Sequence, residues 1–169
     1  MVYNSYAVIR FLITKLIQIQ IWNMRILAIA SIGGHWIQLL RLMPLFQEHE
    51  VTFISTKPNL KDMVKGHKFI TIPDANRTKK LDMCKCILSV TWCVFKTRPK
   101  VVISTGAAPG LIGILAGKLL GAKTIWIDSI ANAEKLSMSG NIATKIADRV
   151  YTQWEHLASS KVIFKGNIL

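Results

Sequence analysis

Hydrophobic residues along this chain fall into short β-branched runs separated by stretches with helical spacing. The runs are typical of strands buried in a parallel sheet. They predict strands at about Arg25–Ala30, Val51–Ser55, Phe69–Ile72, Val101–Ser104, Thr124–Ile127, Arg149–Thr152 and Val162–Phe164. The helical spacing predicts helices at about Trp36–Gln47, Cys84–Lys96, the stretch after Pro109, and Asn141–Ala147. This alternation predicts an α/β fold, a Rossmann-like parallel sheet with helices on both faces.

Polar and glycine-rich turns follow three of the predicted strands. They contain Gly33, Gly34 and His35 after the first, Thr105 and Gly106 after the fourth, and Asp128 and Ser129 after the fifth. Because the carboxyl ends of parallel strands meet at one edge, we expect these residues to share a cleft. The spacing is not the dinucleotide fingerprint GxGxxG, and glycines that merely turn the chain are the alternative. In the helix after the second turn, the spacing of Gly113, Gly117 and Gly121 predicts a close approach to another backbone.

Residues 1–23 differ from the α/β domain expected at 24–169. One face of a predicted amphipathic helix carries most of the membrane-associating candidates, and two charges interrupt it. These candidates are Ile9, Arg10, Leu12, Ile13, Lys15, Leu16 and Ile17. Two central charges make a poor membrane span, so we expect a helix that lies in the membrane surface. An upstream start before Met24, or an extra strand over 17–21, are the alternatives.

The charge is strongly basic and unevenly distributed. Lys and Arg number 22 against 9 Asp and Glu, which gives a net charge of +13. Eleven of the basic residues and only three acids lie between Lys57 and Lys100. Such a stretch favours anionic lipid, a phosphorylated substrate or nucleic acid, or is simply a solvated surface. The chain lacks a nucleic-acid recognition motif, so we do not expect a nucleic-acid partner.

The three cysteines do not predict a metal centre. Cys84, Cys86 and Cys93 all lie in one predicted helix, with no histidine nearby. Buried, reduced cysteines of a cytosolic protein are the expected explanation. The chain also has no Asp-x-Asp motif, so we predict chemistry without a metal ion or cofactor.

Three segments together resemble a known family. Ser31-Ile32-Gly33-Gly34-His35, Ser104-Thr105-Gly106, and Asp128-Ser129-Ile130-Ala131 with Asp148-Arg149 and Gln153-Trp154 are similar to the membrane-anchoring subunit of a two-subunit UDP-N-acetylglucosamine transferase. Its bacterial relatives serve capsule and exopolysaccharide synthesis. The first segment more distantly resembles the glycine-histidine loop of the peptidoglycan lipid-intermediate glycosyltransferase. The family often has Glu at the position of Asp128, and usually a fuller transmembrane segment than residues 1–23 offer.

The resemblance implies one half of a split GT-B hexosyltransferase. This chain would be the N-terminal, acceptor-side half, active only as a heterodimer with a small donor-binding subunit that binds most of the UDP-sugar. The acceptor would be a lipid-pyrophosphate-linked saccharide. The complex would work at the cytoplasmic face of a membrane, the bacterial plasma membrane in this case, with this chain attached to the membrane surface.

The chemistry of glycosyl transfer suggests roles for these residues. His35 is the expected base, because histidine is partly neutral at cytosolic pH; a histidine that only caps a helix is the alternative. Asp128 is expected either to be the base itself or to orient His35. The substrate-binding candidates include Gly33, Gly34 and Gly106, whose amides are expected to bind phosphate. The others are Thr105, and Ser129, Asn132 and Glu134 for sugar hydroxyls.

Two other function classes remain open at this point. A non-catalytic scaffold that recruits a transferase to the membrane would use the same motifs for folding and docking. A fragment of a dinucleotide-dependent oxidoreductase is opposed by the absence of the GxGxxG spacing.

Overall fold

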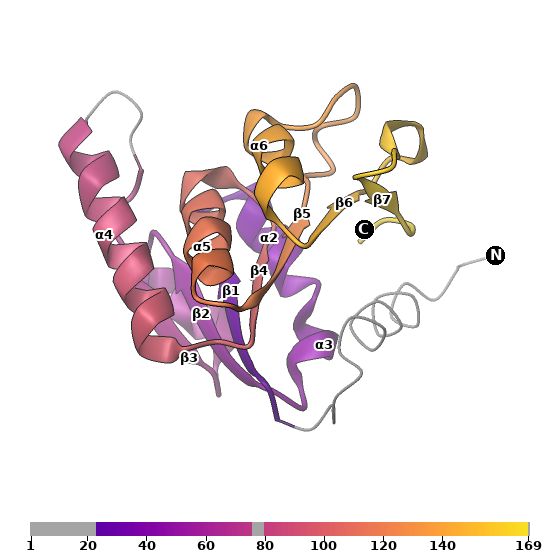
Figure 1. Cartoon of the computed structure of the whole chain (residues 1–169). Helices are drawn as coiled ribbons and strands as arrows, with labels where there is room; N and C mark the ends of the chain where they lie inside the picture. The colour runs from indigo at the N-terminus through magenta and orange to yellow at the C-terminus, as the bar shows by residue number, and fades with distance from the viewer. Residues whose placement is uncertain (1–22, 76–79, 169) are drawn as a thin grey trace.

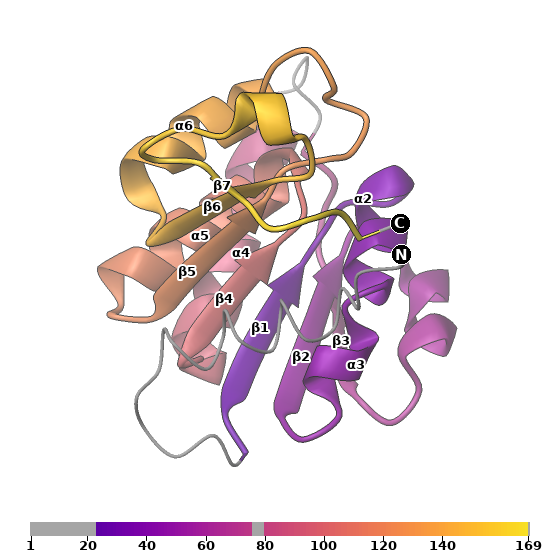
Figure 2. The ribbon, with the colours of Figure 1, turned by 90° about the vertical axis from the view of Figure 1, so that its right-hand side faces the viewer.

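The computed structural model describes residues 23–75 and 80–168, and these form one sheet with helices on both of its faces (Figures 1 and 2). The predicted membrane-associating segment, residues 1–23, lies outside the described residues apart from Asn23. Within the described ranges, no helix combines the length and the apolar character that a membrane crossing requires.

Seven parallel strands form the sheet, in the order β3-β2-β1-β4-β5-β6-β7. The strands are β1 Arg25–Ile29, β2 Glu50–Ser55, β3 Lys68–Thr71, β4 Val101–Ser104, β5 Lys123–Ile127, β6 Arg149–Thr152 and β7 Ile163–Phe164. The chain winds outward from β1 to β3 and then returns to place β4 on the other side of β1. This reversal is the topological switch point of a Rossmann-like fold, where ligands bind beyond the carboxyl ends of the strands.

The helices divide between the two faces of the sheet (Figure 1). One face carries α2 Gly34–Leu40 and α3 Met43–Phe46, and the other carries α4 Lys80–Thr97, α5 Ala107–Leu119 and α6 Met138–Ile146. Two 3₁₀ helices, η1 Pro58–Val64 and η2 Glu155–Leu157, complete the described elements. Alternate residues of β1 enter opposite cores: Ala28 packs with Trp36 of α2, and Ile29 packs with Val90 of α4. The predicted Rossmann-like α/β fold is therefore confirmed.

Several predicted helices have different bounds in the structure. The helix predicted over Cys84–Lys96 begins earlier, at Lys80, as α4. The helix predicted over Trp36–Gln47 is two helices, because Pro44 lacks an amide hydrogen and its ring opposes the carbonyl four residues earlier, in Leu40. The helix predicted from Asn141 begins at Met138, because the Ser137 hydroxyl caps it by accepting from the Gly140 amide (2.8 Å).

The glycines of α5 approach side chains of the sheet rather than another backbone. A Cβ at Gly113 would lie 2.1 Å from Ile29 Cδ1, and one at Gly117 would lie 2.6 Å from Val102 Cγ2. Gly121 lies beyond the end of the helix, with no atom close to the position of a Cβ. The predicted ridge of three glycines is therefore wrong at its third member, and Gly110 against Ser104 replaces it.

The cysteines were predicted to be buried, and this is wrong for Cys84, which is exposed. Cys86 and Cys93 are buried on the sheet side of α4. Burial, with a smaller contribution from Asp74, raises the pKa of the Cys86 thiol to about 11. Burial also raises the pKa of Cys93. Both buried thiols therefore stay protonated and pack as small hydrophobic groups.

Candidate functional site at the carboxyl edge of the sheet

His35 lies directly at the switch point of the sheet. It is the second residue of α2, which follows β1, and its ring reaches the turn that follows β4. His35 Nδ1 lies 3.0 Å from the carbonyl oxygen of Thr105. In the other direction, the Thr105 hydroxyl donates to the carbonyl oxygen of His35 (2.6 Å). Two reciprocal hydrogen bonds thus join the turns after β1 and β4, whose residues are 70 positions apart in sequence.

The hydrogen bond to Thr105 decides which ring nitrogen of His35 carries the proton. A carbonyl oxygen only accepts, so Nδ1 must be the donor. In the neutral imidazole, Nε2 then bears the free lone pair. No described residue donates to or accepts from Nε2, and the side chain of His35 is half-buried. The arrangement can accept a proton at one defined nitrogen.

Gly106 packs directly against the ring of His35. Its φ of +144° is a backbone conformation that L side chains rarely adopt, and a Cβ there would lie 2.2 Å from His35 Nδ1. The Gly106 amide donates to the buried Ser104 hydroxyl (3.2 Å). The next residue, Ala107, also has a positive φ of 66°. The backbone after β4 is therefore bent in a way that makes room for the imidazole.

Asp128 has a different environment from the one predicted. The residue is 2% exposed, and its carboxylate accepts four hydrogen bonds. The donors are Trp126 Nε1 (3.0 Å), Asn132 Nδ2 (3.1 Å), and the amide (2.9 Å) and hydroxyl (2.6 Å) of Ser137. Gly140 packs so closely that a Cβ there would lie 2.5 Å from Asp128 Oδ1.

These contacts do not support the orienting role expected of Asp128 from the sequence, and its expected role as the base stays a prediction. None of its donors is His35, whose Nδ1 contacts Thr105 instead, so Asp128 does not orient His35. Its oxygens are fully engaged and buried, so the geometry also argues against Asp128 as the base. The carboxylate instead fixes the loop over 128–137 and the start of α6.

The other predicted site residues divide between these two clusters and the surface. Gly33 and Gly34 are exposed at the start of α2, beside His35. Asn132 is committed to Asp128, and the Ser129 hydroxyl accepts from the Ala131 amide (3.3 Å). Glu134 is exposed on the same loop. The structure brings Gly33, Gly34, His35, Thr105 and Gly106 together, and places Asn132 against Asp128. Ser129 follows Asp128 in sequence, but its hydroxyl does not contact the carboxylate.

Residues not predicted as site residues tie the loop over 128–137 to the C-terminal part of the chain. Trp154 Nε1 donates to the Ile130 carbonyl (2.8 Å), and Gln153 Nε2 donates to the Asp128 carbonyl (3.0 Å). His156 Nε2 lies 2.6 Å from the Ala133 carbonyl. The sequence offered the Gln153-Trp154 pair as a signal, but not which carbonyl oxygens these two side chains contact.

Asp148 has a structural role at the opposite edge of the sheet. Its carboxylate pairs with Lys118 and accepts from the amide (2.8 Å) and hydroxyl (3.0 Å) of Thr124. Burial raises the pKa of Asp148, but the hydrogen bonds from Lys118 and Thr124 outweigh it, so the pKa lies below the ordinary value. Within the described ranges, no three His, Cys, Asp or Glu side chains gather in a way that would hold a metal ion.

The family is shown by comparison with known proteins. Residues 54–168, more than half of the chain, match the model of the family described as "Oligosaccharide biosynthesis protein Alg14 like". The chain belongs to this family. The match includes Thr105, Gly106 and Asp128, whereas His35 lies before it.

A relative of known name extends the similarity over more of the chain. The UDP-N-acetylglucosamine transferase subunit ALG14 of Candida albicans is 27% identical over 163 residues. That alignment covers 81% of this chain and 74% of the Candida protein.

Solved structures confirm the fold. MurG of Acinetobacter baumannii superposes with a TM-score of 0.67 at 17% identity, over 84% of this chain and 45% of that one. The UDP-GlcNAc 2-epimerase of Neisseria meningitidis, bound to UDP-GlcNAc, gives a TM-score of 0.63 at 15% identity, over 85% and 46%. This chain thus spans less than half the length of either, and its fold is the Rossmann-like half of a GT-B architecture.

Proposed function

We propose that this chain is the acceptor-side subunit of a split glycosyltransferase. Together with a small donor-binding subunit, it transfers a sugar from a UDP-sugar to a lipid-pyrophosphate-linked saccharide. The family, and the Candida relative named as a UDP-N-acetylglucosamine transferase subunit, support the class of reaction. The observation that carries a catalytic role is the His35 ring, held across the switch point with Nε2 free.

In this proposal His35 acts as the base. The acceptor hydroxyl gives its proton to Nε2 while its oxygen forms a bond to the anomeric carbon of the donor sugar, and the bond to the diphosphate of UDP breaks. The Thr105 carbonyl holds the ring in the tautomer that this step needs and stabilises the imidazolium that forms. No residue of this chain is required to bind a cofactor.

The other site residues have supporting roles in the proposal. The exposed amides of Gly33 and Gly34 lie beside the base, where they are placed to bind phosphate of the acceptor or the incoming donor. Exposed Glu134 and the half-buried Ser129 are candidates for sugar hydroxyls. Asn132 is a weaker one because Asp128 engages its amide. The donor and most of its contacts belong to the partner.

The pathway and the membrane location are proposed from the motif resemblance, the predicted amphipathic segment and the charge of the chain alone. The motif resemblance favours bacterial capsule or exopolysaccharide synthesis at the cytoplasmic face of the plasma membrane. Attachment there would combine the predicted amphipathic segment over 1–23 with the basic stretch Lys57–Lys100. The acceptor is itself anchored in a membrane, so attachment would bring the two together.

Reconstitution tests this function. The chain is co-expressed with a candidate small donor-binding subunit from the same genome, and membranes are assayed for transfer from labelled UDP-GlcNAc to a lipid-linked acceptor. We expect transfer only when both chains are present, and its loss in His35→Gln. The matched control, His49→Gln, lies at the opposite edge of the sheet and should transfer normally.

A non-catalytic enhancer is the alternative, and the same assay separates it. Transfer by the partner alone, or full transfer by a complex that carries His35→Gln, would reduce this chain to a scaffold. Copurification of the two subunits shows in each case whether the complex has formed.

A further inference from the structure

The outward face of α4 carries a continuous row of exposed hydrophobic side chains. Leu81, Leu88, Trp92 and Phe95 are 76%, 71%, 62% and 48% exposed. Their spacing of seven, four and three residues places them on one line of the helix, opposite the buried residues that face the sheet. The rings of Trp92 and Phe95 lie 5.9 Å apart. We call this row the α4 stripe.

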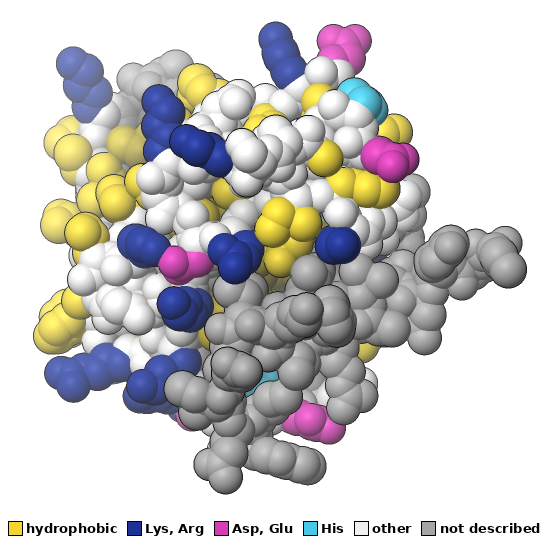
Figure 3. Space-filling view, turned by 45° about the vertical axis from the view of Figure 1, so that its right-hand side comes forward, with side chains coloured by type: hydrophobic (Ala, Val, Ile, Leu, Met, Phe, Trp, Pro, Cys, Tyr) yellow, Lys and Arg dark blue, Asp and Glu magenta, His cyan; other side chains and the backbone are white. Residues whose placement is uncertain are grey.

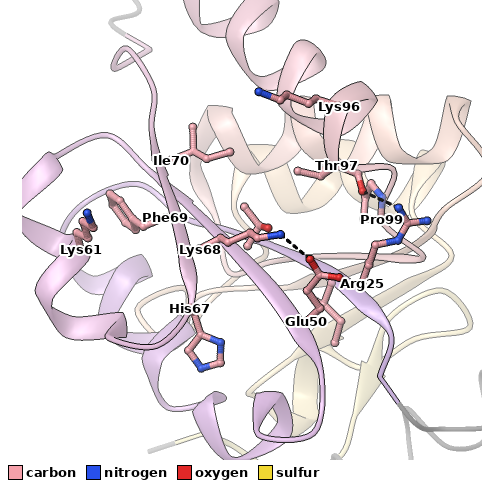
Figure 4. Close-up of a pocket in the computed structure, with 12 residues that line it drawn as sticks. Arg25, Glu50, Lys61, His67, Lys68, Phe69, Ile70, Lys96, Thr97 and Pro99 are labelled. Carbon is pink, nitrogen blue, oxygen red and sulfur yellow. Dashed lines mark hydrogen bonds and ion pairs between the residues drawn. The ribbon is translucent and has the colours of Figure 1, made fainter.

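Two adjoining pockets lie at the amino edge of the sheet, where α4 ends. The larger, of about 740 Å³, lies between the starts of β1, β2 and β3 and the end of α4 (Figure 4). The smaller, of about 400 Å³, lies between the ends of α4 and α5. Arg25 and Pro99 line both pockets. The cationic residues that line the two pockets are Arg25, Lys61, Lys68, Lys96, Arg98 and Lys100.

The charge of these pockets is almost entirely positive. Among the described residues that line them, Glu50 is the one carboxylate, and Lys68 neutralises it at 2.6 Å, as Figure 4 shows. This ion pair lowers the pKa of Glu50 through its hydrogen bond to Lys68. The remaining cations form no described ion pair, so the pockets favour an anionic group.

The stripe and the pockets form one surface. Phe95 belongs to the stripe and also lines the smaller pocket, and the Arg98 guanidinium lies 5.8 Å from the centre of its ring. Leu119 and Leu120 at the end of α5 are also exposed, and Leu120 lines the same pocket. Figure 3 shows hydrophobic side chains beside Lys and Arg along its left margin, the side on which α4 lies.

We propose that this surface docks on an anionic lipid bilayer. Trp92, Phe95 and the leucines would enter the boundary between headgroups and acyl chains, while Arg98, Lys100 and Lys96 bind lipid phosphates. A bilayer presents apolar and anionic groups in adjacent layers, and the side-by-side arrangement of stripe and cations matches that order. This complementarity favours a bilayer over a protein partner.

The proposal deepens the membrane attachment already proposed for the basic stretch Lys57–Lys100, and it rests on the proposed function for the reason why a membrane is useful. α4 runs from the carboxyl edge, after β3, to the amino edge, before β4. A bilayer along α4 therefore also passes close to the carboxyl edge that holds His35. The docked orientation would give a lipid-linked acceptor a short path to the site.

Quenching of Trp92 tests the docking directly, with the full chain and without any transfer reaction. Vesicles contain phosphatidylglycerol and phosphatidylcholine brominated on the acyl chains near the headgroup. We expect these vesicles to quench a tryptophan signal that is absent from Trp92→Phe. Because the readout is local to Trp92, attachment through residues 1–23 does not mimic it. Binding of the protein without quenching of Trp92 would overturn the proposal.

Charge variants test the basic side of the surface. Arg98→Gln with Lys100→Gln should weaken partitioning onto phosphatidylglycerol vesicles about 25-fold, about fivefold for each charge. Lys161→Gln with Lys165→Gln removes the same charge from an exposed segment elsewhere and should change it far less. Equal losses in the two pairs, or equal binding to pure phosphatidylcholine, would overturn the proposal. Loss of transfer with normal docking would instead count against the proposed function.

Discussion

The carboxyl edge of the sheet contains two polar clusters that look alike in sequence and differ in the structure. Each follows a buried strand, and each has an ionisable side chain next to small polar residues. Around His35, one nitrogen is bound to Thr105 and the other is left free. Around Asp128, both oxygens are occupied by donors from its own loop and from Trp126. The number of unused lone pairs, rather than the residue type, separates a candidate base from a structural anchor.

The largest expected effect comes from removing the free nitrogen. His35→Ala should lower transfer by the reconstituted complex about 1,000-fold, because a general base contributes on the order of 10²–10⁴. Its thermal unfolding midpoint should stay close to that of the unmodified chain, since the ring is only half-buried. If His35→Ala keeps transfer within tenfold of the unmodified chain, His35 is not the base, and its cluster is structural like that of Asp128.

Asp128→Ala should have the opposite pattern. The substitution leaves four donors without their acceptor, and we expect a loss of about 3 kcal/mol in the free energy of unfolding. Urea denaturation measures the loss, and transfer per folded complex should fall far less than in His35→Ala. If Asp128→Ala folds normally but is inactive, the carboxylate is catalytic after all.

Gly106→Ala tests whether the position of the ring matters as well as its presence. The new Cβ would overlap His35 Nδ1, so the ring must leave the Thr105 carbonyl or the turn must move. We expect transfer to fall by up to about 100-fold, the loss that a misplacement of about 1 Å can cause. Gly66→Ala is a matched control, because Gly66 also has a positive φ but has open space around it. A similar loss in both variants would point to backbone strain alone.

The smallest effect concerns Asp148, whose pKa is lowered. A carboxyl group with a lowered pKa in the folded state stabilises the fold at pH values above its unfolded pKa. That contribution is lost as the pH falls below the ordinary value of 3.8 and through the folded pKa. Asp148→Asn should therefore be less stable at neutral pH by under about 1 kcal/mol, because the Lys118 partner is solvent-exposed. The difference should vanish in acid, as measured by urea denaturation from about pH 6 to pH 2.

The fold and the two clusters were predictable to different degrees. β-branched runs and glycine turns predicted all seven strands to within a residue or two, since a buried parallel strand leaves a strong local signal. The sequence predicted that His35 and Thr105 lie at the same edge of the sheet, but not that they are hydrogen-bonded. The order of strands specifies which turns are neighbours, not which side chains in them touch. The hydrogen bonds that Asp128 accepts were not predictable, since they depend on the Ser137 and Trp126 side chains pointing toward the same carboxylate.

The glycines of α5 allow this helix to pack closely against the sheet along its length. Gly110, Gly113 and Gly117 let this helix rest directly on Ser104, Ile29 and Val102, so the depth of the whole helix is set by contacts along its length. A helix moves nearly as a rigid rod, and Gly106 sits at its first turn. A methyl group added at Gly117, about three turns from the imidazole, would press on Val102 and is expected to tilt the helix and shift His35 without touching it. Substitutions that disturb the position of His35 need not lie at the edge of the sheet that holds it.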